Sequence, residues 1–220
     1  KGTSPISGQT ISRFEPREWR VINVPRTAYA IKNAEDHGVV PVSVQPSAYP
    51  SYAKKFFDTD PENFETTVYD KAKDEESYEF AFYMLENRQP FKKEPATYNE
   101  RSRQIKTIDG MNEKISVEYY VDGTYYSKEM KLFENANDFS TYVVVTGYVE
   151  MNLANDDAGQ ILGGEVEYLI HLGDWNAGNS NFKTERNTSY TYTVTVNSVN
   201  NIRVEVESSK PGNTFQEPQP

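Results

Sequence analysis

The stretch Asn187-Thr-Ser-Tyr-Thr-Tyr-Thr-Val-Thr-Val-Asn197 decides the fold class. Its even-numbered positions hold Tyr190, Tyr192, Val194 and Val196, with threonines between them. Because side chains alternate between two faces along a strand, one face of this segment is apolar and the other carries hydroxyl groups. Aromatic and β-branched residues favour such a pleated, half-buried surface. The segment is therefore predicted to be a strand.

The same alternation resumes after Ser198-Val-Asn-Asn201. Ile202, Val204 and Val206 are apolar, and charged residues stand between them. An Asn-rich connection of this length is typical of a turn between antiparallel strands. The two segments together predict a β-hairpin close to the end of the chain.

The remainder of the chain carries similar signals. Strands are predicted over residues 19–24, 39–44 (at an edge or bulge, because of Pro41), 65–69, 78–85, 115–132, 141–151 and 165–172. Residues 45–63 are predicted to be a long ordered loop, and residues 97–105 a short helix capped by Thr97. Seven to nine strands with at most one short helix predict an all-β, antiparallel β-sandwich.

Residues 115–132 form the clearest predicted hairpin. Asp122-Gly123 is a preferred pair for a type I′ turn, since both residues tolerate positive φ. This turn sets Tyr120 opposite Tyr125, and cross-strand aromatic pairs stabilise hairpins. Polar residues on both faces predict that the hairpin projects from the body of the domain.

Composition limits the possible functions. The 220 residues are enough for one large β-domain or two small ones. The formal net charge of −10 argues against nucleic acid and against an anionic membrane surface as partners. The chain has no Cys, which excludes disulfides, thiolate metal sites and Cys nucleophiles. No apolar run reaches the length of about 18 residues that a membrane-spanning helix needs.

The motifs of common enzymes are missing. There is no Gly-x-Ser-x-Gly elbow, phosphate-binding loop or dinucleotide fingerprint, and only His37 and His171 are present. His37 lies in a charged turn, and His171 lies on the strand face opposite the apolar set, which favours a structural or solvated role. We therefore expect no enzyme activity, no catalytic residue, no metal and no cofactor.

Two acidic clusters, residues 58–62 and 152–157, have oxygen ligands suited to Ca²⁺. Neither has the Gly and terminal Glu of an EF-hand loop, so solvated turns explain them more simply. A glycoside hydrolase needs two positioned carboxylates. With 33 acidic residues in the chain, the sequence alone nominates no pair.

Three aromatic residues are candidates for an exposed binding surface. Trp175 lies in a Gly- and Asn-rich loop, and Tyr120 and Tyr125 lie in the predicted hairpin. Exposed aromatic rings stack on sugars and anchor protein interfaces. Ordinary packing against a neighbouring loop is the simpler interpretation of each.

The end of the chain resembles a known family. The late strands of fimbrillin-type proteins of the Bacteroidales, which are type V pilus subunits and their minor or tip components, resemble three segments: Tyr168-Leu-Ile-His-Leu-Gly-Asp174, Phe182-Lys-Thr-Glu-Arg-Asn-Thr-Ser-Tyr-Thr-Tyr-Thr-Val-Thr-Val196 and Ile202-Arg-Val-Glu-Val206. The earlier Val21-Ile-Asn-Val-Pro25 and Phe82-Tyr-Met-Leu-Glu-Asn87 resemble segments of the minor-subunit branch. The resemblance is specific over residues 140–207 and weaker before them.

This resemblance implies a transthyretin-like sandwich in a lipoprotein precursor that is displayed on the outer membrane. Such subunits assemble by adding a strand of one subunit to the next, and they contact host or bacterial surface proteins or glycans. Residues 11–208 would form the sandwich, residues 113–133 a hairpin insertion, residues 1–10 a linker and residues 209–220 a disordered tail. The chain would then be one domain of a longer precursor, with Phe182 in the core and with Arg186 and Asn187 fixing the loop before the strand.

Three functional hypotheses remain open from the sequence. The first is a structural and adhesive domain of a cell-surface pilus subunit that assembles by strand addition. The alternative is a carbohydrate-binding module of a surface glycan-uptake system, which the exposed aromatic candidates motivate. The third is a fragment of a glycoside hydrolase.

Overall fold

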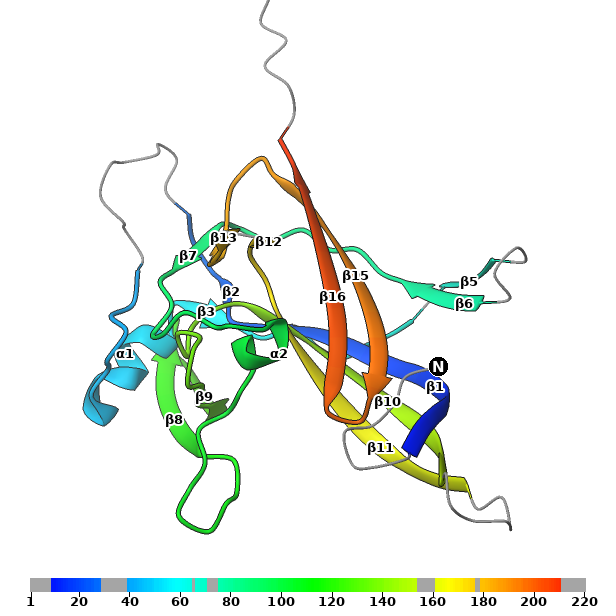
Figure 1. Ribbon diagram of the computed structural model, residues 1–220. Helices are drawn as coiled ribbons and strands as arrows, with labels where there is room; N and C mark the ends of the chain where they lie inside the picture. Colours follow the sequence, from blue (N-terminus) through cyan, green and yellow to red (C-terminus); the bar gives the residue numbers. More distant parts are fainter. Residues whose placement is uncertain are drawn as a thin grey trace, which may run out of the picture.

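The computed structural model describes residues 9–28, 39–64, 66–70, 75–153, 161–176 and 179–210, and these form an all-β protein of antiparallel pairs (Figure 1). The strands are β1 (Gln9–Ile22), β2 (Val24–Pro25), β3 (Phe56–Phe57), β4 (Glu62–Asn63), β5 (Thr66–Asp70), β6 (Glu75–Glu79), β7 (Asn87–Gln89), β8 (Lys114–Val121), β9 (Thr124–Lys131), β10 (Tyr142–Leu153), β11 (Ile161–His171), β12 (Trp175–Asn176), β13 (Asn179–Ser180), β14 (Phe182–Thr184), β15 (Ser189–Ser198) and β16 (Asn201–Ser209). The helical turns are η1 (Pro46–Ala48), α1 (Tyr49–Ala53) and α2 (Tyr98–Arg101). The predicted all-β, sandwich-like fold is confirmed.

The largest sheet has the strand order β11-β10-β1-β4. Its centre is β10, which pairs along nearly its whole length with both β1 and β11. A bulge follows Pro16, whose partner across the sheet is Gly147. A Cβ atom at Gly147 would lie only 2.6 Å from the carbonyl oxygen of Glu15, so this position accepts only glycine.

The β15–β16 hairpin packs across this sheet and forms the second layer (Figure 1). Ile202 and Val204 of β16 are buried in the core cluster that contains Val143 of β10. The layers are also joined by hydrogen bonds, since the hydroxyl of Tyr168 donates to the carbonyl of Ser198 at 3.0 Å. The predicted apolar face of this hairpin is therefore the face that meets the sheet.

The β8–β9 hairpin pairs with no other described strand. Asp122 and Gly123 have φ angles of 49° and 81°, which confirms the turn. One face of the hairpin is nevertheless buried in a second core, where Val117 and Met130 pack near Phe139. The expectation of polar, solvated faces on both sides was wrong for this face.

The structure differs from the predicted elements in the first half of the chain. Residues 39–44 form no strand, and β6 ends at Glu79 instead of continuing through residue 85. The predicted loop 45–63 contains η1 and α1, where Pro46 and Pro50 stand at first-turn positions that suit proline. The predicted helix 97–105 is the single turn α2, and β1 begins at Gln9, inside the predicted linker.

Candidate functional site

Residues 80–86 connect β6 to β7 and keep the side-chain alternation of a strand. Phe80, Phe82 and Met84 are partly buried against the first core cluster. Tyr83 and Leu85 point outward, with exposed fractions of 104% and 40%. The predicted strand 78–85 is therefore wrong beyond Glu79, because residues 80–85 belong to no described sheet, although their side chains keep the predicted alternation.

The backbone of this segment is not part of a described sheet. Residues 80–85 make no backbone hydrogen bond to another residue that the structure describes. Aromatic contacts hold the segment instead, because the Trp19 ring stacks on Phe80 at 4.4 Å and on Phe82 at 5.9 Å between centroids. Phe64 adds an edge-to-face contact with Phe80 at 5.4 Å. The aromatic side chains of this segment are therefore packed, while its peptide groups make no hydrogen bond to other described residues.

Strand β15 has a second unpaired edge. Among the described strands it pairs only with β16. Its inward-facing side chains are incompletely covered, since Tyr192, Val194 and Val196 are only partly buried against the first core cluster. The second layer therefore leaves both apolar surface and backbone groups available beside β15.

The opposite edge of the hairpin is covered. Asn99 of α2 accepts a hydrogen bond from the backbone N–H of Ile202 at 3.1 Å and donates one to the backbone carbonyl of Ile202 at 3.0 Å. The side-chain amide thereby replaces a neighbouring strand at this point of β16. Covering an edge in this way prevents unwanted pairing, and β15 has no comparable cover among the described residues.

Residues 80–86 lead into β7 and β14 leads toward β15, so both segments adjoin the β7–β14 pair. Strand β7 pairs with β14, with Asn87 opposite Thr184. Immediately beyond, Glu86 and Arg186 form an ion pair, and Asn187 adopts a left-handed φ of 53° that turns the chain into β15. The hydrogen bond from Arg186 lowers the pKa of Glu86. The roles predicted for Arg186 and Asn187 in fixing this loop agree with this geometry, and Phe182 is buried as predicted.

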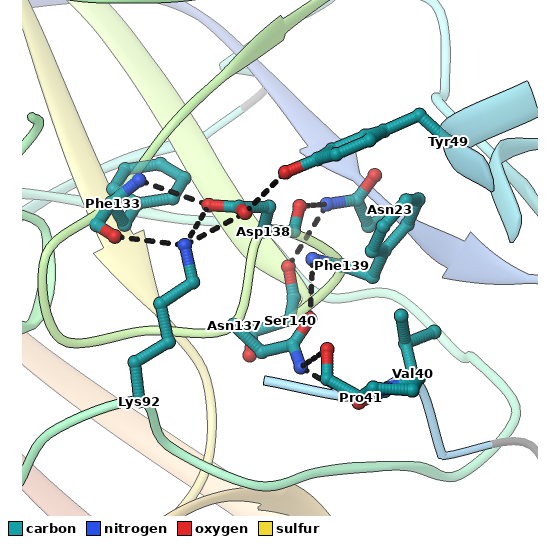
Figure 2. A network of polar contacts seen from close by, with 10 residues as sticks. All are labelled: Asn23, Val40, Pro41, Tyr49, Lys92, Phe133, Asn137, Asp138, Phe139 and Ser140. Atoms are coloured by element: carbon teal, nitrogen blue, oxygen red, sulfur yellow. Dashed lines mark hydrogen bonds and ion pairs between the residues drawn. The ribbon is translucent and has the colours of Figure 1, made fainter. Parts of the chain in front are cut away.

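A buried carboxylate, Asp138, organises the polar interior near β7 (Figure 2). Asp138 accepts hydrogen bonds from Lys92 Nζ at 2.7 Å, from the Tyr49 hydroxyl at 2.9 Å and from the backbone N–H of Phe133 at 3.0 Å. Burial, and then the charge of Asp138, raise the pKa of Tyr49 above its usual value. The sequence analysis did not identify this carboxylate, because its partners Lys92 and Tyr49 lie 46 and 89 residues away.

Strand β7 is fixed to the same interior. The Asn87 side chain donates to the Phe139 carbonyl at 3.0 Å and to the Thr141 hydroxyl at 2.8 Å. Gln89 accepts from the backbone N–H of Val40 at 2.8 Å and donates to Asn87 at 2.8 Å. Buried side-chain hydrogen bonds therefore hold β7 in place, whereas the described residues offer no such bonds to the backbone of residues 80–85.

His171 is fully buried and has no catalytic geometry. Its ring lies among Phe133, Tyr142 and Phe182, with centroids 4.6–5.4 Å away. The Ser102 hydroxyl donates to a backbone carbonyl at 2.6 Å, so its oxygen accepts from Nδ1 of His171 at 2.9 Å. His171 therefore does not act as a base toward this serine. Burial, and then the charge of Arg101, hold its pKa well below 6.5.

Trp175 is a packing residue, which corrects its prediction as an exposed binding aromatic. It lies in β12, partly buried, with an edge-to-face contact to Tyr98 at 5.6 Å. The guanidinium of the fully buried Arg101 lies 5.7 Å from its ring and 4.2 Å from that of Phe182. Gly- and Asn-rich neighbours suggested a solvated loop, but the tertiary packing around Arg101 covers the ring.

Tyr120 and Tyr125 are exposed, with fractions of 68% and 49%, as their prediction requires. Their ring centroids lie 5.3 Å apart at an interplanar angle of 60°, so they form no flat platform. They belong to the hairpin of the second core, whereas Trp175 packs on the first. The structure therefore does not bring the three predicted aromatics together.

The acidic clusters offer no visible metal site. Among the described residues, no group of three or more His, Asp or Glu side chains could hold a metal ion. Asp58 of the first cluster pairs with Lys128 instead. In the second cluster, residues 154–157 lie outside the described residues, as does His37. In the same described part of the chain, no helix is long and apolar enough to cross a membrane.

Comparisons with protein-family models, with curated proteins and with solved structures found no match.

Proposed function

We propose that this chain is a structural and adhesive domain of a cell-surface pilus subunit, attached to the outer membrane through its assembly. It takes up an extended strand of a neighbouring subunit at the unpaired edges beside residues 80–85 and β15. One observation carries the proposal. Residues 80–85 keep the side-chain alternation of a strand and make no backbone hydrogen bond to another described residue.

The free backbone groups of residues 80–85 and β15 favour the addition of a strand. Each backbone hydrogen bond that an added strand makes contributes about 1 kcal/mol net. Proteins rarely leave a long, flat edge unpaired, because it recruits other chains. Stacking of Phe80 on Trp19 already holds residues 80–85 in place, so strand addition costs little further conformational entropy.

The incoming segment must match the partly covered apolar surface. Phe82 and Val194 face inward from the two unpaired chains. A segment with apolar residues at every second position buries those residues against this surface and exposes its polar ones. The partner is therefore an extended, alternating segment of another subunit.

A peptide experiment tests this proposal. The probe is a synthetic peptide of about ten residues, the length of a long strand, in which Val and Thr alternate. The control peptide has the same composition with a central Pro, which removes a backbone donor. We expect the first peptide to raise Tm and to protect the amides of residues 80–85 and β15 from hydrogen exchange. Absence of protection at both sites would refute the proposal.

The carbohydrate-binding alternative retains one observation, the exposed pair Tyr120 and Tyr125 at the hairpin tip. Tyrosine rings at an exposed tip can stack on sugars. A glycan array compares the protein with the Tyr120→Ala/Tyr125→Ala double variant, and Tyr83→Ala serves as an exposed control. Binding that only the double variant loses would favour this alternative.

A further inference from the structure

Three polar side chains from distant parts of the chain meet beneath the β8–β9 hairpin. Lys128 of β9 places its Nζ 2.9 Å from Oδ1 of Asn23 and 2.5 Å from Oδ1 of Asp58. Asn23 is 1% exposed, and the side chains of Lys128 and Asp58 are 10% and 29% exposed. An amine, a primary amide and a carboxylate thus lie in direct contact in a largely buried position.

The amide is held in one orientation (Figure 2). Its Nδ2 donates to the carbonyls of Asp138 at 2.8 Å and Ser140 at 3.1 Å. The backbone N–H of Asn23 donates to Asp58 at 3.0 Å, and its φ is 59°. The side-chain carbonyl therefore stays turned toward Lys128. The carbonyl carbon is about 1.2 Å from Oδ1, which puts Nζ about 3–4 Å from it, close to a near-attack distance.

The surroundings favour a reactive amine. Burial lowers the pKa of Lys128, and the positive charges of Arg20 and Arg26 lower it further, whereas Asp58 opposes them. A desolvated lysine beside other cations is the usual form of a nucleophilic amine. Asp58 touches the amine and can accept its proton, as a general base does.

We propose that Lys128 and Asn23 form an intramolecular isopeptide bond. The Nζ lone pair attacks Cγ of Asn23, and the bond between Cγ and Nδ2 breaks. Asp58 takes a proton from Nζ and passes it to the departing nitrogen, which leaves as ammonia. The step is an amide exchange, so it needs no oxidant, reductant or cofactor.

The product would join β9 to the connection between β1 and β2. These positions are 105 residues apart in sequence, so the bond closes a long loop. The bond also replaces a largely buried cation with a neutral amide, which removes the desolvation cost of that charge. The chain has no Cys, and the isopeptide bond would supply a covalent cross-link without one.

Intact-mass measurement of the full chain tests the proposal. We expect a mass lower than the sequence mass by one ammonia molecule, and a branched peptide that joins Lys128 to Asn23 after proteolysis. An unchanged mass with separate peptides would overturn it, as would a loss of one water in a branch between Lys128 and Asp58.

Variants identify the roles of the three residues. Lys128→Arg keeps the charge and cannot form the amide, and Asp58→Ala removes the proton acceptor. Both variants are expected to restore the full sequence mass. Lys114→Arg, at the exposed pair with Glu129 on the same hairpin, is the matched control and should keep the lower mass. A lower mass that persists in Lys128→Arg would overturn the assignment.

Discussion

His171 should make stability depend on pH. Its folded-state pKa is depressed by burial, so below about pH 6.5 the unfolded chain binds a proton that the folded chain does not. Stability is therefore complete above pH 6.5 and falls as the pH decreases. A single proton changes the free energy of unfolding by at most about 1.4 kcal/mol per pH unit, so we expect this free energy to decrease steadily as the pH falls from about 7.5 to about 5.

Urea unfolding at several pH values measures this loss. His171→Gln should flatten the pH dependence in this range, whatever its effect on absolute stability. His37→Gln is the matched control, since it removes the only other histidine. If His37→Gln removed the slope and His171→Gln kept it, the assignment to His171 would be wrong.

Asp138 is the residue whose loss should destabilise the fold most clearly. Asp138→Ala leaves Lys92 partly buried without its partner and removes the acceptor of the Tyr49 hydroxyl. Breaking one side of a buried pair costs about 3–5 kcal/mol. Glu165→Gln breaks the exposed pair with Arg17 and should cost at most about 1 kcal/mol. Equal effects of the two variants in chemical denaturation would contradict the buried network.

Among the elements, the covered edge of β16 makes a measurable prediction. Asn99→Ala removes both hydrogen bonds to the backbone of Ile202. We expect a loss of about 1–3 kcal/mol and faster hydrogen exchange at Ile202, because two backbone groups lose their partners. Asn112→Ala, in an exposed loop, should change neither quantity. Unchanged exchange at Ile202 in Asn99→Ala would show that β16 needs no cover.

The elements that the sequence predicted well depend on local information. The β15–β16 pair and the Asp122-Gly123 turn follow from alternation and from residues that tolerate positive φ. Residues 78–85 show the limit of this reasoning. Their alternation correctly identified the inward face, but alternation does not reveal whether a neighbouring strand is present. Pro41 indicated a strand at an edge or bulge over residues 39–44, but these residues form no strand in the structure.

The alternation in residues 78–85 and 190–196 was visible in the sequence, but the free backbone edges of the candidate site were not. The contact of Lys128, Asn23 and Asp58 could not be predicted either, because these residues are separated by 35 to 105 residues and no motif joins them. Trp175 looked exposed because Arg101, which covers it, lies in a different element. The exposure of Tyr120 and Tyr125 was predictable, because a hairpin tip carries few neighbours.

At the scale of the whole molecule, two cores differ in completeness. The second core, under the hairpin, buries Phe139 and Val40 fully. The first core carries a row of partly buried side chains beneath residues 80–85 and β15. A ligand that binds only the folded state raises its stability by mass action. If the proposed strand addition occurs, the bound strand should therefore stabilise the domain by covering this row of side chains.

A crystal structure of the chain bound to the alternating Val-Thr peptide would test strand addition. We expect a peptide in extended form, hydrogen-bonded along residues 80–85 or the free edge of β15, with its valines on the first core. A peptide bound only at Tyr120 and Tyr125, with residues 80–85 and β15 still unpaired, would contradict strand addition and favour the carbohydrate-binding alternative.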